Sequence, residues 1–454
     1  MEFLSINPYT GETLAALPAH EDRHVERALG RAADMARIWR EGGFAPRAAV
    51  LRAVARLLRE RQGAYAALMA QEMGKPVREG RAEVLKCAWT CEFYAEHAEG
   101  WLADEPVTTD AARSAVVYEP LGTILGIMPW NFPLWQVIRA AAPILMAGNT
   151  FLLKHASNVP QCALALEALF RDAGAPEGAF QTLLLRAERI PALIEDPRVH
   201  GVTLTGSEAA GRKVAAVAGA ALKPCVMELG GSDAFIVLED ADLDVTLDQA
   251  VRARFQNGGQ SCIAAKRFIV HSSLAEAFIE GLAERIGSLR YGDPLHEDTD
   301  LGPLARADLR DEVMGQVQAS LREGASLRLG GTVIPGAHAG MHATLLTEVT
   351  PGMTAFDQEI FGPVASVTVA QDDMHALTLA NASRFGLGGS VWTRDMVRGE
   401  GLARALECGA AFVNGMVKSD PRLPFGGVKL SGYGRELSAF GIREFVNVKT
   451  VWVA

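Results

Sequence analysis

Short apolar runs that alternate with helical stretches are the feature that most constrains the fold of this chain. Residues 122–128 (GTILGIM), 150–154 (TFLLK) and 201–205 (GVTLT) are rich in β-branched and aliphatic side chains, and a stretch with helical spacing follows each run. Strands that alternate with helices run parallel, because each crossover helix returns the chain to the same edge of the sheet. We therefore predict an α/β protein built on mostly parallel sheets.

Composition narrows the class of protein further. The chain has 454 residues, of which 49% are hydrophobic and 22% are charged, so it can bury two or three domain cores and is not disordered. Its net charge of −10 argues against a dedicated nucleic-acid-binding surface. Apolar segments such as residues 140–148 fall well short of the ~20 residues that span a bilayer, and residues 1–11 lack the features of a secretory signal. We expect a cytoplasmic protein.

The six cysteines are too few for a disulfide scaffold, and Cys87 and Cys91 have no second pair at zinc-ligand spacing, so no metal site is expected. Cys262 differs from the others because glycines lead to it in residues 255–262 (FQNGGQSC), and residues 263–265 are expected to begin a helix. A thiol at the positive end of a helix is favoured as the nucleophilic thiolate. The pattern also fits a cysteine chosen for packing, so the residues alone leave both roles open.

Glu228 and Asn131 are two further candidates with two possible roles each. Glu228 ends an apolar stretch in residues 226–231 (VMELGG), where a carboxylate is either a structural cap or a base with a raised pKa. Asn131 lies between two prolines in residues 128–133 (MPWNFP), and a rigid amide there suits either an oxyanion hole or turn chemistry.

Taken together, these motifs resemble those of the aldehyde dehydrogenase superfamily, and the resemblance covers essentially the whole chain. Cys262 follows Glu228 by 34 positions, as the family pattern expects. The matching segments, in the family's order, are residues 128–133, 152–157 (LLKHAS), 205–211 (TGSEAAG), 227–231 (MELGG), 255–262, 359–363 (EIFGP) and 424–436 (PFGGVKLSGYGRE).

The resemblance implies a reaction sequence. Cys262 would attack an aldehyde, the Asn131 amide and the backbone N–H of Cys262 would hold the oxyanion, and a hydride would pass to a nicotinamide. Glu228 would activate the water that hydrolyses the thioester. Relatives that transfer the acyl group to coenzyme A do not need this base, so Glu228 favours a carboxylate product. A non-catalytic paralogue is expected to lose Cys262 or Glu228, and a cysteine hydrolase needs a paired histidine, which neither motif contains.

The cofactor prediction combines the residues with the resemblance. Gly206 and Ser207 follow the run at 201–205 and would open a helix whose N–H groups meet a pyrophosphate. Ser157 stands where NAD-selective relatives carry a glutamate, so we predict that NADP is preferred and NAD is possible; a helix N-cap is the alternative role of Ser157. In the family, Lys154 would contact the adenosine ribose and Trp130 would line the cofactor cleft. Glu359 and Phe361 would hold the nicotinamide ribose and ring.

The substrate prediction rests on Arg139, which lies in an otherwise apolar segment. A buried arginine needs an anionic partner, either a protein carboxylate or a ligand. The resemblance to bacterial succinate-semialdehyde dehydrogenases favours the ligand, since those enzymes carry an arginine there and a serine at the position of Ser419. Gln256 replaces a second arginine found in some of them. We therefore expect oxidation of succinate semialdehyde, as in 4-aminobutyrate degradation, with a broader aldehyde or glutarate-semialdehyde dehydrogenase as the alternative.

The family architecture implies a Rossmann-like cofactor-binding domain, a second α/β catalytic domain and a small β oligomerisation extension. Residues 108–118 and 444–453 are strand-like, which fits such an extension and predicts a homodimer or homotetramer. The expected boundaries are residues 1–105 and 123–229 for the cofactor domain, 230–435 for the catalytic domain, and 106–122 and 436–454 for the oligomerisation segments.

Overall fold

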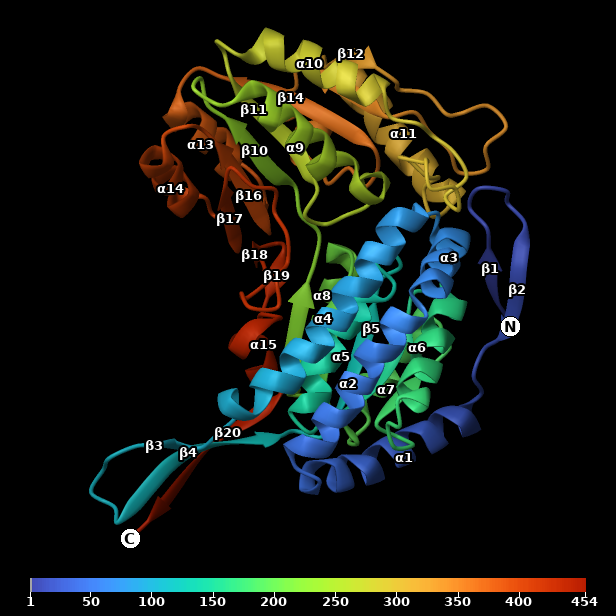
Figure 1. The fold of residues 1–454 in the computed structure, drawn as a ribbon, viewed down its shortest axis with the longest axis vertical. Helices are drawn as coiled ribbons and strands as arrows, with labels where there is room; N and C mark the ends of the chain where they lie inside the picture. The colour runs from blue at the N-terminus through green and yellow to red at the C-terminus, as the bar shows by residue number, and fades with distance from the viewer. Residues whose placement is uncertain (1) are drawn as a thin grey trace.

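Two helix-covered sheets make up the body of the protein, and a three-stranded ribbon extends from it (Figure 1). The computed structural model describes residues 2–454. The α/β class expected from the sequence is confirmed, because most strand pairs in both large sheets are parallel and helices connect them. Within residues 2–454, no helix has the length and apolar character needed to cross a membrane.

The first sheet has the topology that creates a binding crevice. Its strand order is β19 (Gly432–Tyr433), β9 (Cys225–Glu228), β8 (Val199–Thr205), β5 (Thr123–Met128), β6 (Thr150–His155) and β7 (Phe180–Thr182), and only β19 is antiparallel to its neighbour. The chain starts at β5, proceeds outward through β6 and β7, and then returns to the other side through β8 and β9. The chain therefore continues from β5 to β6 on one side and later reaches β8 on the other side of β5. In open α/β sheets, ligands bind at the carboxyl ends of the strands where the order reverses in this way.

The helices around this sheet come from the first half of the chain. Four precede β5: α1 (Asp22–Glu41), α2 (Phe44–Glu60), α3 (Gln62–Met73) and α4 (Val77–Trp101). The others connect its strands: α5 (Trp135–Met146), α6 (Pro160–Asp172), α7 (Ile190–Glu195) and α8 (Glu208–Ala220). Strands β5 and β6 are buried along nearly their whole length, which is typical of parallel strands covered on both faces.

The second sheet lies above the first in Figure 1. Its order is β12 (Ser326–Leu329), β13 (Thr344–Thr347), β14 (Val364–Ala370), β11 (Ala265–His271), β10 (Asp233–Val237), β16 (Gly388–Trp392) and β17 (Ala410–Val413), and only the β12–β13 pair is antiparallel. Its helices are α9 (Leu243–Phe255), α10 (Ala275–Gly287), α11 (Ala307–Arg322), α12 (Thr354–Asp357), α13 (Asp373–Asn381) and α14 (Met396–Ala405). Cys262 and Glu359 precede β11 and β14, which are neighbours, so both residues lie at the amino edge of this sheet.

The ribbon contains the two segments expected to be strands. It consists of β3 (Glu105–Pro106), β4 (Arg113–Pro120) and the C-terminal β20 (Val446–Val453). β20 pairs along its whole length with β4 of the same chain, from Val446 opposite Pro120 to Val453 opposite Arg113. Smaller elements complete the fold: β1 (Glu2–Ile6) with β2 (Thr13–Pro18), β15 (Phe385–Gly386) with β18 (Val428–Lys429), and α15 (Ser438–Arg443).

Candidate active site

Cys262 lies in a turn, and no helix follows it. A short 3-10 helix, Gln256–Gly259, precedes the turn, and β11 begins three residues after the cysteine. The expected helix at residues 263–265 is therefore wrong, because these residues lead directly into the sheet. The left-handed backbone of Asn257, Gly258 and Gly259 produces the turn, and a Cβ on Gly259 would collide with the carbonyl of Gly362.

The environment of the thiol also differs from the expected one. Burial raises the pKa of Cys262 to about 12, although Arg139 and Lys266 act in the opposite direction. Without a helix N-terminus, the cationic side chains supply the stabilisation of the thiolate. The Lys266 ammonium donates to the carbonyls of Ser261 at 2.7 Å and Cys262 at 2.9 Å, so it also fixes the backbone at Cys262.

Glu228 ends β9 and is 2% exposed. Burial raises the pKa of its carboxyl well above the ordinary value, and Arg139 is the largest opposing influence. Within residues 2–454, Glu228 Oε1 has no hydrogen-bond partner, and it is the backbone carbonyl of Glu228 that accepts from the N–H of Gly206 at 3.0 Å. The Glu228 side chain therefore does not have the hydrogen bonds of a structural cap, and its geometry suits a buried base.

The Asn131 amide is fixed by the loop that carries Cys262. Asn131 Nδ2 donates to the carbonyl of Gln260 at 3.1 Å, and the carbonyl of Asn131 accepts from Asn257 Nδ2 at 2.7 Å. An amide nitrogen has two hydrogens, so the second remains for an oxyanion.

Glu83 fixes the backbone just after Asn131, at residues 134 and 135. It accepts from the N–H groups of Leu134 and Trp135 at 3.0 and 2.9 Å and forms a buried ion pair with Lys75. No sequence pattern indicates this support, because Glu83 lies far from Asn131 along the chain.

The segment with Glu359 and Phe361 is tied to the cysteine loop by Arg254, which is fully buried. Arg254 donates to the carbonyls of Gly259 at 3.3 Å, Ile360 at 3.0 Å and Gly362 at 2.6 Å. Sequence reasoning missed this residue; the available signal was its place between Ala253 and Phe255 at the end of α9.

The side chains of Glu359 and Phe361 have their own partners. Glu359 Oε1 lies 3.3 Å from Lys266 Nζ and accepts from the N–H of Gly231 at 3.0 Å. The rings of Trp130 and Phe361 meet edge to face at 5.7 Å between centroids. The fold therefore brings together Trp130, Glu359 and Phe361, which lie far apart in the sequence.

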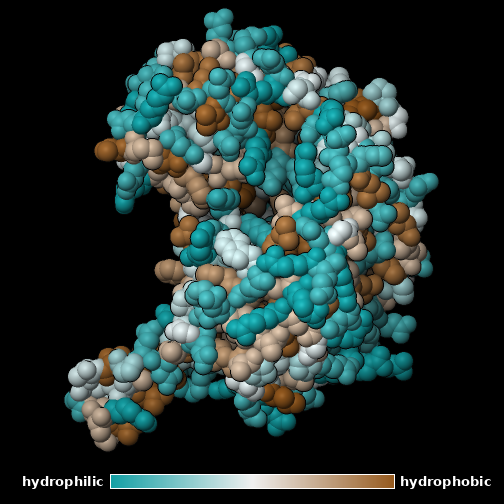
Figure 2. All heavy atoms as spheres, viewed as in Figure 1, coloured by the Kyte–Doolittle hydropathy of each residue, from teal (hydrophilic) through white to brown (hydrophobic). Residues whose placement is uncertain are grey.

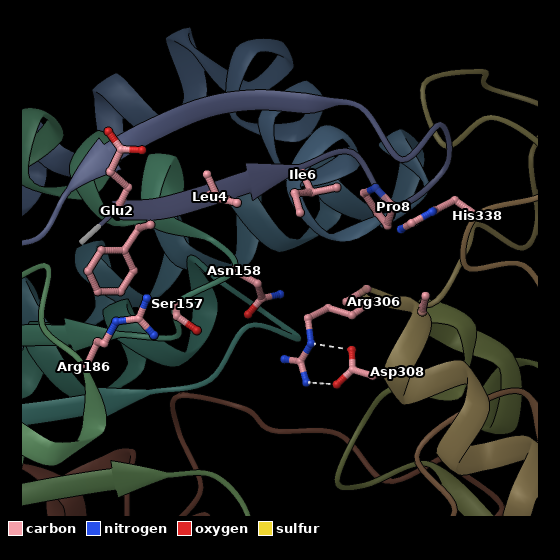
Figure 3. A pocket seen from close by; sticks show the side chains of 13 residues that line it. Glu2, Leu4, Ile6, Pro8, Ser157, Asn158, Arg186, Arg306, Asp308 and His338 are labelled. Carbon is pink, nitrogen blue, oxygen red and sulfur yellow. Dashed lines mark hydrogen bonds and ion pairs between the residues drawn. The ribbon is translucent and has the colours of Figure 1, made fainter.

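The remaining predicted cofactor residues lie at the carboxyl edge of the first sheet. Ser207 is the N-cap of α8 and accepts from the N–H of Ala210 at 3.3 Å. Ser157 follows β6 but is not an N-cap, because α6 begins only at Pro160. Ser157 and Arg186 line one cavity of about 420 Å³ (Figure 3). Burial lowers the pKa of Lys154, which lies on β6.

A cavity of about 180 Å³ adjoins Cys262, and all three predicted substrate residues line it: Arg139, Gln256 and Ser419. The Arg139 guanidinium forms a buried ion pair with Glu436 and donates to Thr205 Oγ1 at 3.2 Å. Of the two partners that the residues allowed for Arg139, the structure thus supplies the protein carboxylate. A role of Arg139 toward a substrate stays a prediction.

The Arg139–Glu436 pair predicts a stability effect. Replacing Arg139 with methionine leaves the buried Glu436 carboxylate unpaired, and loss of one partner of a buried pair costs about 3–5 kcal/mol. We expect the Tm of Arg139→Met to fall by several degrees and the double variant with Glu436→Gln to recover most of the loss. Thermal unfolding of the two single variants and the double variant measures this coupling. Additive losses would contradict the pairing.

The comparisons with known proteins agree with the site. Residues 1–451 match the family described as the aldehyde dehydrogenase family. The Escherichia coli succinate semialdehyde dehydrogenase Sad, named for NAD(P)+, is 50% identical over 449 residues, which cover 99% of this chain and 97% of the relative. An NADP(+) succinate-semialdehyde dehydrogenase of Mycobacterium tuberculosis H37Rv is 50% identical over 459 residues and covers 100% of both chains.

The solved structures give the same result. The crystal structure of a succinic semialdehyde dehydrogenase from Streptococcus pyogenes with NADP+ has a TM-score of 0.98 and 37% identity, and the match covers 99% of each chain. A family match over nearly the whole chain, full-length relatives and a matching fold lead to one conclusion. This chain belongs to the aldehyde dehydrogenase family.

Proposed function

We propose that this protein oxidises succinate semialdehyde to succinate, with NADP as the preferred cofactor and NAD as a possible one. The observation that carries the proposal is the cavity in which Cys262 shares its walls with Arg139 and Ser419. The full-length relatives named for this substrate support it. The test is the formation of NADPH from NADP and succinate semialdehyde. A kcat/KM no higher than that for butanal, an uncharged aldehyde of the same length, would contradict the proposal.

Each chemical step has a residue at the site. Cys262, as the thiolate, forms a bond to the aldehyde carbon, and Arg139 and Lys266 favour the charged sulfur. The Asn131 amide and the backbone N–H of Cys262 stabilise the alkoxide. A nicotinamide held by Glu359 and Phe361 would supply the acceptor for the hydride that leaves the aldehyde carbon. Glu228 then takes a proton from the water that hydrolyses the thioester on Cys262, and succinate leaves.

The residues at the sheet edge fit a dinucleotide phosphate. α8 follows β8 directly, and a Cβ on Gly206 would meet only the Leu204 side chain at 3.7 Å, so the backbone there is open to a pyrophosphate. Ser207 would bind this group as well, and Lys154 would bind the adenosine ribose. Trp130 would line the cofactor cleft, and Glu359 and Phe361 would hold the nicotinamide and its ribose.

Ser157 provides a test of cofactor choice. Its hydroxyl can donate to a 2′-phosphate, whereas a carboxylate repels that group, so Ser157→Glu is expected to lower the NADP to NAD ratio of kcat/KM by about 10- to 100-fold. Steady-state kinetics with both cofactors measures the ratio. Ser157→Ala is the control: it removes the hydroxyl without adding charge and should shift the ratio less. A ratio that does not respond to Ser157→Glu would contradict the assignment.

Glutarate semialdehyde and uncharged aldehydes form the second substrate class. Gln256 lines the cavity and adds no positive charge there, so selectivity for chain length should be lower than in relatives with an arginine at this position. We expect these substrates to be oxidised with a lower kcat/KM than succinate semialdehyde.

We further propose that the protein acts in the cytoplasm as a homodimer or homotetramer. Its six cysteines are free thiols, which fits a reducing compartment. The β3–β4–β20 ribbon projects from the body and carries apolar atoms on its surface (Figures 1 and 2). Val448, Trp452 and Val453 of β20 are exposed, and such a strand edge is suited to pairing with a second copy.

A further inference from the structure

Lys86 is a cation in the cavity at Cys262 that the sequence analysis did not single out. It projects from α4 and lines this cavity together with Arg139, Ser419 and Cys262. Its ammonium donates to Ser419 Oγ at 2.6 Å and lies 4.2 Å from the centroid of the Trp135 ring. Ser419 is itself 7% exposed, so the hydroxyl and the ammonium form a partly enclosed polar end of the cavity.

Four cations line the cavity, and their surroundings differ. Arg139 is buried and paired with Glu436, Arg252 and Lys418 are exposed, and Lys86 is only partly exposed. For the described residues 2–454, no carboxylate oxygen lies within 4.0 Å of Lys86 Nζ. A desolvated cation without an anionic partner is costly unless a ligand supplies the negative charge. Among the cations that line the cavity, Lys86 is therefore the one that is both enclosed and without a carboxylate partner within residues 2–454.

Titration of Lys86 is consistent with this environment. Burial, together with Arg139 of α5, lowers the pKa of Lys86 to about 8. Cys87 and Glu83 of α4 and Asp420, next to Ser419, act in the opposite direction and raise the pKa of Lys86. A bound carboxylate favours the charged ammonium, so substrate binding and protonation of Lys86 support each other.

We propose that Lys86, together with Ser419, binds the distal carboxylate of the semialdehyde and sets the preference for an anionic aldehyde. This proposal rests on the proposed function. The carboxylate would accept a charge-assisted hydrogen bond from the ammonium and one from the Ser419 hydroxyl. Lys86 thus acts in substrate specificity and takes no part in the bond changes at Cys262. Arg139, already neutralised by Glu436, contributes less net attraction.

The test compares two aldehydes of equal length. The kcat/KM for succinate semialdehyde is divided by that for butanal, because both substrates share the chemistry at Cys262 and differ at the distal carboxylate. We expect Lys86→Met and Lys86→Gln to lower this ratio about 10- to 100-fold through KM, while butanal oxidation stays close to that of the wild type. Retained butanal oxidation also shows that the variants are folded.

Lys418→Met is the matched control. Lys418 is an exposed cation at the rim of the same cavity, and its removal should change the ratio less than about twofold, because an exposed charge contributes little. An equal loss in Lys418→Met and Lys86→Met would mean that the general positive field decides the preference, and would overturn the proposal.

The pH dependence gives a second readout that does not need a variant to fold. In the wild type, the ratio should be constant below pH 8 and fall above it as Lys86 loses its proton, and competitive inhibition by succinate should weaken over the same range. A ratio and an inhibition constant independent of pH up to 10, or a wild-type ratio in Lys86→Met, would overturn the role of Lys86. A wild type that does not prefer succinate semialdehyde over butanal would instead overturn the proposed function, and this inference with it.

Discussion

Replacing Cys262 with alanine is expected to lower kcat for aldehyde oxidation by at least about 10⁴-fold. The adduct that gives up the hydride and the thioester that follows are both bonded to the Cys262 sulfur. Among residues 2–454, no other cysteine lines the cavity. Steady-state NADPH formation at saturating succinate semialdehyde measures the effect.

Cys408→Ala is a control for the loss of a partly buried thiol. The Cys408 thiol donates to the carbonyl of Ala410 in the second sheet, away from the cavity at Cys262, so kcat should stay within about twofold of the wild type. If Cys262→Ala retained more than a hundredth of the wild-type kcat while Cys408→Ala did not, the nucleophile would be misassigned.

Replacing Glu228 with glutamine is expected to separate the two halves of the reaction. Glutamine cannot accept a proton from water, so hydrolysis of the thioester should slow by about 10²- to 10⁴-fold, while Cys262 still forms the thioester. Rapid mixing should therefore show a burst of NADPH equal to the number of active sites, followed by slow turnover.

The pH dependence of the same two enzymes checks the role of Glu228. Only the ionised carboxylate is a base, and burial raises the pKa of Glu228 well above its ordinary value. In the wild type, kcat should therefore rise with pH as this group loses its proton, and the slow turnover of Glu228→Gln should lack this rise. A variant without a burst, or with an unchanged pH profile, would place the base elsewhere.

The candidates for the reacting groups could be proposed from the sequence because their signals are local, and the resemblance to the family favoured one of the two roles of each. Cys262 follows a glycine-rich turn, Glu228 ends an apolar strand, and Asn131 lies between prolines. The alternation of strands and helices likewise predicted parallel sheets, and the carboxyl edge of such a sheet gathers the loops after β5, β6 and β8.

The errors came from contacts between distant segments. The expected helix after Cys262 is absent because residues 265–271 pair with β10 and β14, and tertiary pairing overrides local helix preference. The expected low pKa of Cys262 failed for the same reason: the sequence does not show how deeply the thiol is buried.

The sequence by itself determined the fold class and supplied the candidates for the reacting groups. Only the tertiary structure decided which charges are paired. Arg139 is matched by Glu436 and Lys266 by Glu359, whereas Lys86 contacts Ser419 and the Trp135 ring and has no carboxylate oxygen within 4.0 Å among residues 2–454. The physical reason is that the free energy of a buried charge depends on the groups within a few ångströms of it. These groups come from segments that only folding brings together.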